Sequence, residues 1–417
     1  MIKVRRKLRI QYYLVLEHFV KNQLDNKYTA ARLEQYRIKF FKDLSPIEGN
    51  NKIDDLIKAL LNNPKQPWRK KYPYFILCDI ALLLMDYILI SKAANEMMKY
   101  MTQKQGKQLK VLLRVFEDEY MDITSFPYAK GLIMQYINNR NFIQQPIKKY
   151  LVTANMSAGK STLINALIGK PLARTSQEVC TGNICHLYNK PFEDNHIHLD
   201  NDTFSMNASK VELASLSWDK RSKLASYFRG VEEIKQRLCL IDTPGVNSAI
   251  NRNHGRISRE ALKSEDYDKV IYILNANKLG TDEEIAHIKW ISENVPRDKV
   301  IFVLNKLDNF KVNDDDISSS IEGVRKDLVN LGFENPIICP ISAYFALLIK
   351  MKSSGDEMTE DEIDEYELYT KKFKKSMYDL SKYYEDVHED ENDSEIISIS
   401  KKCGLYGLEK LLLGGAL

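Results

Sequence analysis

Apolar positions follow two different spacings along the chain, and the change falls near residue 146. Before it they recur every three to four positions, as in residues 109–116, which predicts helices. Turn-forming residues at 45–51 and 62–67 interrupt this spacing, so we expect four to six helices. We therefore predict an all-α region over residues 1–146, closed by Pro146.

The most apolar window, residues 72–90, contains two carboxylates, Asp79 and Asp86. A separation of seven positions would place both on the same face of one helix. Because an acid at the centre of a bilayer is costly, we interpret the window as a core helix with one polar edge and not as a membrane span.

From residue 147 to residue 345, short apolar runs alternate with helical patterns. Runs of this length between polar residues are typical of buried parallel strands. The order predicts an α/β fold, with a mostly parallel sheet and helices on both faces. The expected strands are residues 150–153, 183–188, 196–199, 237–241, 270–274, 300–304 and 337–340.

Beyond the sheet the composition changes. Residues 351–395 carry dense acidic runs with lysines between them, and we expect a charged insertion that is part helix and part mobile loop. Residues 404–412 have the spacing of a closing amphipathic helix. The second predicted domain therefore covers residues 147–417.

The net charge of +4 hides an asymmetry, because residues 1–150 carry about +13 and the remainder about −9. A solvated lysine-rich surface is the more common meaning of such a segment, with contact to anionic lipid or nucleic acid as the alternatives. The six cysteines form no C-x-x-C pair, which indicates buried thiols in a reducing compartment. The N-terminus is basic, but no uninterrupted apolar region and no small-residue cleavage site follow it, so we predict no signal peptide. With no predicted membrane span either, we expect a cytoplasmic protein and leave peripheral membrane contact open.

The candidate chemistry begins where the first strand ends. A strand, a tight loop and a helix that opens on Gly-Lys-Ser form the setting of a phosphate-binding loop. Free N–H groups and the helix dipole favour an anion there, Lys160 can reach the β- and γ-phosphates, and Ser161 can ligate Mg²⁺. The first glycine of the usual pattern is Ala154, which fits if its φ stays negative. The predicted loop consists of Asn155, Met156, Ser157, Ala158, Gly159, Lys160, Ser161 and Thr162.

A second motif, Asp-Thr-Pro-Gly at residues 242–245, directly follows an apolar strand. The Asp242 carboxylate can hold Mg²⁺ through water, and Gly245 can offer its N–H to the γ-phosphate without a side chain in the way. A threonine that closes on Mg²⁺ is expected between this motif and the loop. We choose Thr181 for it and keep Thr175 and Ser176 as alternatives.

The third motif, Asn-Lys-Leu-Asp at residues 305–308, is the most specific of the four. The Asp308 carboxylate can accept hydrogen bonds from guanine N1–H and from the exocyclic amine, and adenine lacks both donors in that place. Lys306 would lie along the base, and Asn305 would tie neighbouring loops together.

The fourth motif, Ser342-Ala343, follows the last expected strand. A backbone N–H of Ser342 or Ala343 can meet guanine O6 there. This dipeptide is a weak signal alone, but its order behind the other three motifs predicts GTP or GDP with Mg²⁺ as the ligands. ATP is the alternative nucleotide.

With these motifs in place, the chain resembles the bacterial dynamin-like GTPases over about residues 147–417. The resemblance implies hydrolysis of GTP to GDP and phosphate, nucleotide-dependent pairing of G domains, and often membrane remodelling. It also implies that residues 1–146 form a neck- and stalk-like region, that the loop 275–282 is a pairing surface, and that Ser157 lies near the bridging phosphate oxygen. The matching segments are residues 155–167, 272–282 and 404–409.

Two features depart from that family. Classical dynamins place a glutamine beside the loop serine to orient the attacking water, whereas Met156 stands there in this sequence. The catalytic candidates are Lys160, Ser157 and Thr181. In the family, long helices follow the G domain, whereas this sequence stops at Leu417. A truncated chain, a partner subunit that completes the stalk, or a function without membrane remodelling would each explain that end.

Two other functional classes stay open. A nucleotide-gated scaffold would bind GTP, hydrolyse it slowly and act through protein partners docked on the N-terminal helices. A GTPase of RNA or ribosome assembly would use the basic segment, but residues 1–150 show no recognisable RNA-binding module, so nucleic acid is not favoured.

Overall fold

The fold is known from a computed structural model, and it divides into two compact units. The first unit comprises Met1–Gln145 with Thr203–Met206, and the second comprises Pro146–Asp202 with Asn207–Leu417. The structure describes residues 6–23, 26–41, 52–62, 70–117, 123–155, 157–172, 184–201, 204–214, 222–245, 253–311 and 316–414.

The first unit is built from helices packed around their own apolar core. Within its described residues there are seven α-helices, so the prediction of four to six is wrong. No helix in the described parts of the chain is both long and apolar enough to cross a membrane. The α-helices are α1 (Arg6–Lys21), α2 (Lys27–Phe41), α3 (Ile53–Leu61), α4 (Tyr72–Leu84), α5 (Tyr87–Met98), α6 (Gln103–Glu117) and α7 (Lys130–Gln144).

The most apolar window forms two helices and not one, which corrects the prediction of a single core helix. Met85 has a left-handed backbone with a φ of 52°, and this ends α4. Asp86 then caps α5, because its side chain accepts a hydrogen bond from the Leu89 N–H at 3.0 Å. Asp79 and Asp86 therefore do not share a helix face.

Asp79 lies inside the core of the first unit and is 8% exposed. The Tyr12 hydroxyl donates to Asp79 Oδ2 at 2.6 Å, and the Tyr36 hydroxyl donates to Oδ1 at 3.2 Å. Burial raises the pKa of Asp79 from 3.8 to about 6, although the two tyrosine hydrogen bonds act in the opposite direction.

The second unit contains a sheet in which its strands follow the order β3-β5-β2-β6-β1-β7-β8-β9. The pairs β1–β6, β1–β7, β7–β8, β8–β9 and β2–β5 are parallel, and β2–β6 and β3–β5 are antiparallel. The predicted α/β class is therefore confirmed. The strands of this unit are β1 (Lys148–Ala154), β2 (Cys185–Asn189), β3 (His198–Asp200), β5 (Ser222–Ser226), β6 (Leu238–Asp242), β7 (Lys269–Asn275), β8 (Val300–Asn305) and β9 (Ile337–Pro340). The short strand β4 (Phe204–Ser205) belongs to the residues of the first unit.

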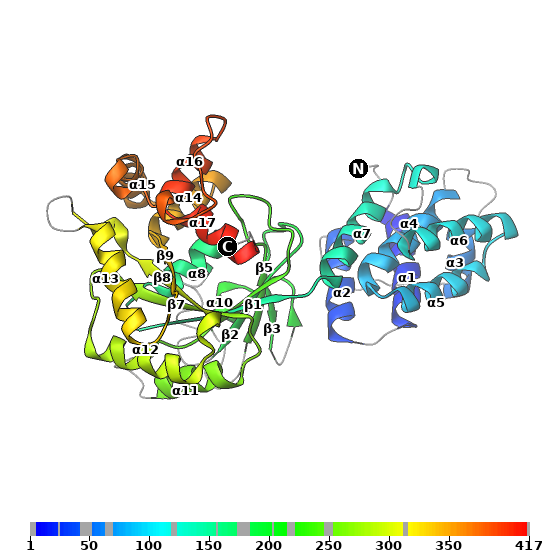
Figure 1. The fold of residues 1–417 in the computed structure, drawn as a ribbon. Helices are drawn as coiled ribbons and strands as arrows, with labels where there is room; N and C mark the ends of the chain where they lie inside the picture. The colour runs from blue at the N-terminus through cyan, green and yellow to red at the C-terminus, as the bar shows by residue number, and fades with distance from the viewer. Residues whose placement is uncertain are drawn as a thin grey trace. The chain divides into compact units, whose positions relative to one another are not determined.

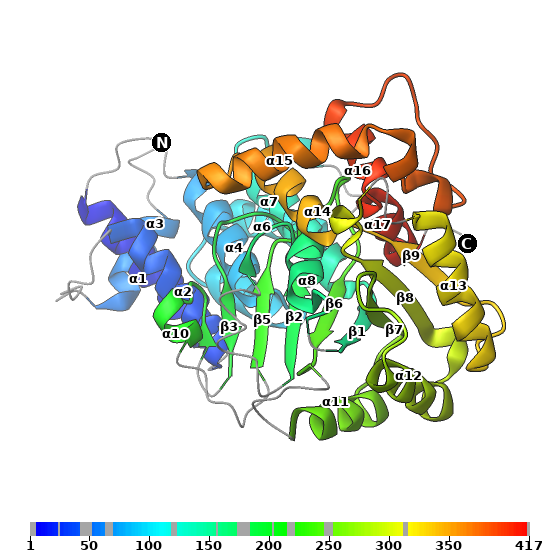
Figure 2. The same cartoon turned by 90° about the vertical axis from the view of Figure 1, so that its left-hand side faces the viewer.

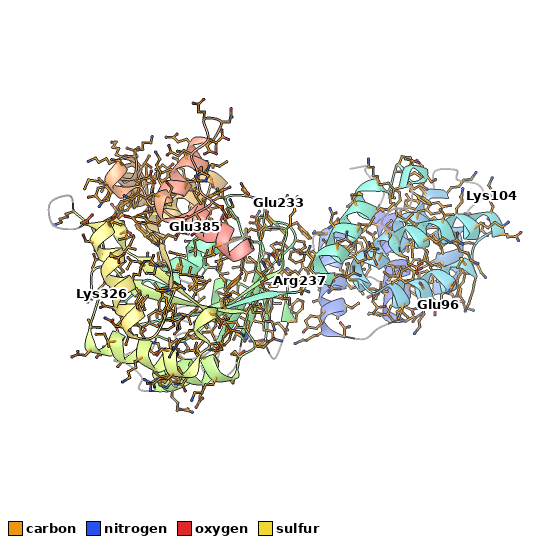
Figure 3. The ribbon with its side chains drawn as sticks, in the orientation of Figure 1. Glu96, Lys104, Glu233, Arg237, Lys326 and Glu385 are labelled. Atoms are coloured by element: carbon orange, nitrogen blue, oxygen red, sulfur yellow. The ribbon has the colours of Figure 1, made fainter. Side chains whose placement is uncertain are left out.

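Helices cover both faces of this sheet. Figures 1 and 2 show α8 and α14 on one face and α11, α12 and α13 on the other. On α13, Ile321, Val324 and Leu328 are buried, whereas Lys326 is exposed and points away from the sheet (Figure 3). The helices are α8 (Lys160–Ile168), α10 (Lys210–Ala214), α11 (Asn253–Ser264), α12 (Asp282–Asn294), α13 (Ile317–Asn330) and α14 (Ala343–Ser354).

The segment expected to be a charged insertion, residues 351–395, is described throughout. It contains the end of α14, the helix α15 (Glu360–Phe373) and two short 3₁₀ turns, and it leads into α16 (Glu395–Lys402) and α17 (Leu405–Leu413). Phe373 is fully buried and stacks on Phe345 with a centroid distance of 5.3 Å. The segment is thus packed against the core of the second unit.

Candidate functional site

The predicted loops meet at one edge of the sheet. In the register of the parallel strands, Val152 of β1 pairs with Asp242 of β6, and Asn275 of β7 pairs with Asn305 of β8. The segments that follow these strands leave from their carboxyl ends, where ligands bind in open α/β sheets. Ala154 stays in β1 and pairs with Ile273, so the missing first glycine costs the strand nothing.

The loop between β1 and α8 turns sharply before the helix. Gly159 has a φ of 93° and forms the N-cap of α8. A Cβ at this position would lie 2.3 Å from Asn305 Nδ2, so glycine is required both by the backbone angle and by the close approach of Asn305. Ser157 has a φ of 63° and is exposed.

At the start of α8, the Lys160 ammonium donates a hydrogen bond to Asp242 Oδ1 and forms an ion pair with it. Asp242 is 5% exposed, at the end of β6. The neighbouring Ser161 Oγ is buried and has no hydrogen-bond partner among the described residues. A buried hydroxyl without a partner is unfavourable, because nothing replaces its lost contact with water. A bound cation could supply that partner, and the oxygen atoms of Ser161 and Asp242 are the type of ligand that a hard cation such as Mg²⁺ prefers.

Asn305 connects three of the four motifs. Its Nδ2 donates to the Ala158 carbonyl oxygen at 3.0 Å, and its Oδ1 accepts from the Ala343 N–H at 3.0 Å. Asn305 therefore links the phosphate-binding loop to the segment that contains Ala343, which is the kind of connection that the sequence predicted for it. The same bond engages the Ala343 N–H, one of the two groups that the sequence proposed for guanine O6.

The turn after β8 carries Asp308 in a short 3₁₀ helix, η4 (Leu307–Asn309). Ser342 Oγ donates to Asp308 Oδ1 at 2.7 Å and so orients the carboxylate. Lys306, with a φ of 71°, places its Cε 3.9 Å from where a Gly159 Cβ would stand, so its side chain extends over the phosphate-binding loop. Asp308, Ser342 and Lys306 are thus close together, as the sequence order predicted.

Two contacts to this turn were missed by sequence reasoning. The Lys372 ammonium on α15 donates to the carbonyl oxygens of Asp308 and Phe310. The Tyr378 hydroxyl also donates to the Phe310 carbonyl at 3.1 Å. Both residues come from the charged segment, 62 to 68 positions further along the chain, where local pattern gave no signal of this contact.

The loop predicted as a pairing surface, residues 275–282, connects β7 to α12 and is anchored at both ends. Asn275 Nδ2 donates to the Ser157 carbonyl oxygen at 3.4 Å, which links this loop to the phosphate-binding loop. At the other end, the buried Glu284 accepts from the Gly280 N–H at 3.2 Å, and burial raises the pKa of Glu284 to about 7.

Several predicted residues are not tied to the others by these contacts. Met156 and Thr181, with the alternatives Thr175 and Ser176, lie outside the described residues. Gly245 lies three positions after Asp242, Asn155 directly follows β1, and Thr162 is the third residue of α8. Their binding roles stay predictions.

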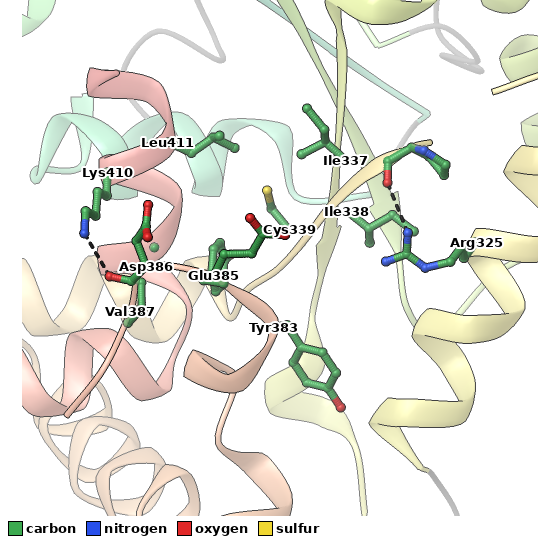
Figure 4. Close-up of a pocket in the computed structure, with 13 residues that line it drawn as sticks. Arg325, Ile337, Ile338, Cys339, Tyr383, Glu385, Asp386, Val387, Lys410 and Leu411 are labelled. Atoms are coloured by element: carbon green, nitrogen blue, oxygen red, sulfur yellow. Dashed lines mark hydrogen bonds between the residues drawn. The ribbon is translucent and has the colours of Figure 1, made fainter. Parts of the chain in front are cut away.

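A cavity of about 230 Å³ lies elsewhere in the second unit, between β9 and residues 383–387 (Figure 4). Arg325 and Lys410 stand on opposite sides of it, and they donate to the carbonyl oxygens of Pro336 and Asp386 at 3.4 and 2.8 Å. None of the predicted nucleotide-binding residues that the structure describes lines this cavity, so it is separate from the candidate site.

Comparison with known proteins connects this geometry to a family. The model of the dynamin family matches residues 151–307, which include the first two motifs and residues 305–307 of the third. This part of the chain is therefore similar to the dynamin family. The predicted dynamin-like class is thereby confirmed, and a bacterial origin within it stays a prediction.

Two proteins are similar to this chain in sequence. An uncharacterized protein in the xynA 3′ region of Caldicellulosiruptor sp. (strain Rt8B.4) is 27% identical over 277 residues, which cover 63% of this chain and 66% of that protein. A probable transmembrane GTPase, FZO-like and chloroplastic, from Arabidopsis thaliana is 24% identical over 206 residues, which cover 49% of this chain and 20% of that protein. The chain therefore spans less than two thirds of the length of either relative.

Among solved structures, the chain was matched to a variant of Era from Aquifex aeolicus bound to GDP and AlF₄⁻. The identity is 15%, the TM-score is 0.28, and the match covers 51% of this chain and 58% of that one.

Proposed function

We propose that the chain binds GTP with Mg²⁺ at the junction of the four motifs and hydrolyses it to GDP and phosphate. The observation that carries this proposal is the meeting of Lys160, Asp242 and the partnerless Ser161 hydroxyl within a dynamin-type domain. A half-buried cation, a buried carboxylate and an unsatisfied hydroxyl together match what a nucleotide phosphate with a divalent ion requires.

In this proposal the phosphate chain lies over the N-terminus of α8. The ammonium of Lys160 exchanges its contact with Asp242 for the β- and γ-phosphate oxygens, and the loop N–H groups add further donors. Ser161 and Asp242 would hold Mg²⁺, directly and through water, with Thr181 as the third candidate. When bound, Mg²⁺ neutralises charge on the phosphates.

The Asp308 carboxylate gives the proposal its base specificity. Ser342 Oγ donates to one carboxylate oxygen at 2.7 Å, which fixes the direction in which the other oxygen can accept. Guanine offers two donors to such a carboxylate, N1–H and the exocyclic amine, whereas adenine offers neither there. A site built to bind those donors discriminates strongly against a base without them.

Hydrolysis follows by in-line attack of water on the γ-phosphorus. The new bond forms from the water oxygen, the bond to the β–γ bridging oxygen breaks, and GDP leaves with the bridging electrons while the water protons pass to phosphate and solvent. Lys160 stabilises the charge that develops on the phosphate oxygens, and Ser157 is proposed near the bridging oxygen. A methionine at position 156 cannot orient the water by hydrogen bonding.

Self-association is proposed to complete the site. The loop 275–282 is linked to the phosphate-binding loop through Asn275, so a second G domain docked on it can influence the γ-phosphate end of the site. We propose residues 1–146 as a neck- and stalk-like region that carries the pairing to a partner or to a membrane surface. A cytoplasmic location is proposed from the five described cysteines, which are all free and buried.

The variant Lys160→Ala tests the placement of the phosphates. We expect it to lose tight binding of GTP and GDP in an equilibrium titration, because the deleted ammonium is the cation for the β- and γ-phosphates. Lys289→Ala, an exposed lysine of α12, is the matched control and should bind as the wild type does. An unchanged GTP affinity in Lys160→Ala would rule out this site.

A further inference from the structure

Lys372 holds the backbone of the turn that carries Asp308. Its Nζ donates to the carbonyl oxygens of Asp308 and Phe310, so one ammonium bridges both sides of the exit from η4. It also lies over the Tyr378 ring at 4.5 Å, and the Tyr378 hydroxyl shares the Phe310 carbonyl. Hydrogen bonds from a charged donor are the stronger class, so this is a substantial tie.

The turn needs contacts that stabilise it, because its first residue has a backbone conformation that is unfavourable for residues other than glycine. Lys306 enters it with a φ of 71°, in the left-handed region that disfavours side chains other than glycine. The structure therefore supplies outside contacts that hold the turn in place. Lys372 contributes to them through the backbone, and Ser342 contributes through the Asp308 side chain.

Lys372 is itself held on a rigid element. Helix α15 begins with a capping box, in which Thr359 and Glu362 each accept from the other's backbone N–H. The next residue after Lys372, Phe373, is fully buried and stacks on Phe345 of α14. Because α14 starts at the Ser342 cap, the two supports of Asp308 belong to one packed assembly.

We propose that Lys372 is a positioning residue for guanine recognition, which fixes the Asp308 turn in the geometry that accepts the base. This inference rests on the proposed function of the site. Lys372 lies outside the region matched by the dynamin-family model, residues 151–307, so this support comes from the chain's own charged segment.

The proposal predicts a loss confined to nucleotide binding. A turn that is no longer held must be ordered each time the base binds, and that cost falls equally on bound substrate and on the transition state. KM for GTP should therefore rise while kcat stays constant. The loss should also be larger for GTP than for inosine triphosphate, because hypoxanthine lacks the exocyclic amine that Asp308 would accept from.

The experiment compares three full-length variants with the wild type. Lys372→Met keeps the length of the side chain and removes its charge, Lys372→Arg keeps the charge, and Lys371→Met makes the same charge change at an exposed neighbour on α15. In Lys372→Met we expect KM for GTP to rise about tenfold, which is less than the two lost charge-assisted hydrogen bonds are worth because Ser342 and Tyr378 still support the turn, with kcat within about twofold. Lys372→Arg should recover part of the affinity, and Lys371→Met should match the wild type.

The outcomes separate this inference from the proposed function. If the wild type binds no GTP, the proposed function fails, and the inference fails with it. If the wild type binds GTP and Lys372→Met leaves both KM and the GTP-to-ITP preference unchanged, only the inference is overturned. Should Lys372→Met not fold, Tyr378→Phe, which removes the second donor to Phe310, must show a smaller loss of the same kind, and an unchanged KM there would also overturn it.

Discussion

Removing the Asn305 side chain is the perturbation whose effect can be worked most directly from contacts. Asn305 is 2% exposed, and its amide makes two hydrogen bonds of 3.0 Å, to the Ala158 carbonyl and from the Ala343 N–H. The variant Asn305→Ala leaves both backbone groups in place without partners. Three loops of the site lose their common attachment at once.

The magnitude follows from the cost of unsatisfied buried groups. Each such group costs about 1 to 3 kcal/mol, and water entering the vacated space recovers part of that. We therefore expect the free energy of unfolding of the second unit to fall by about 2 to 4 kcal/mol. The Ala343 amide should also lose its protection from hydrogen exchange, because its acceptor is gone.

The assay must report the second unit alone, because a chain of two units is not expected to unfold in a single step. Hydrogen exchange of peptides from β8 and α14, followed as urea is raised, meets this need. The control is Asn294→Ala, which removes an exposed bond from Nδ2 to the Trp290 carbonyl at 2.8 Å and should cost less than about 0.5 kcal/mol. Equal losses in the two variants would refute the reasoning.

Three further predictions concern other parts of the molecule. Asp308→Asn should weaken GTP and improve binding of xanthosine triphosphate in competition titrations, because the new amide donates to the carbonyl that replaces the exocyclic amine; unchanged GTP preference contradicts it. Since burial raises the pKa of Asp79 from 3.8 to about 6, the first unit should lose roughly 3 kcal/mol of stability as the pH rises between those values and then level off, in pH-resolved urea unfolding. Asp79→Asn should remove that dependence. Lys278→Glu, at an exposed position of the loop 275–282, should abolish any rise of specific GTPase activity with protein concentration while GTP affinity stays constant, and a persistent rise would exclude this loop as the pairing surface.

The sheet was largely predictable, because a strand that is buried on both faces must be apolar. The runs that form β1, β6, β7 and β8 are short, apolar and bounded by polar residues, as such strands are. β5 was missed since its sequence, Ser-Lys-Leu-Ala-Ser, has only two apolar positions, and its place beside β2 depends on pairing that lies outside local pattern. The division of the 72–90 window into two helices depends on Met85, which ends α4, and on Asp86, which caps α5. The sequence pattern had suggested instead that Asp86 lies on the polar edge of one continuous helix.

The candidate site also contains some residues that the sequence predicted and some that it did not. Motif order predicted that Lys160, Asp242, Asn305 and Asp308 stand at strand ends, and the structure brings them to one edge of the sheet. Motif order could not predict the contact of Lys372 with the Asp308 turn, because a lysine within a charged run carries no local signal of a partner 64 positions away. Long-range contacts of single polar side chains depend on the whole packing of α15 and are not encoded in spacing.

The most direct test of the central claim is the rate of phosphate release from GTP per chain, measured with Mg²⁺ over a range of protein concentrations beside Lys160→Ala. The account predicts that the wild type hydrolyses GTP, that its specific activity rises with concentration, and that Lys160→Ala is inactive at every concentration. A rate that is flat and near zero would contradict the account and leave a GTP-dependent scaffold as the better description of the chain.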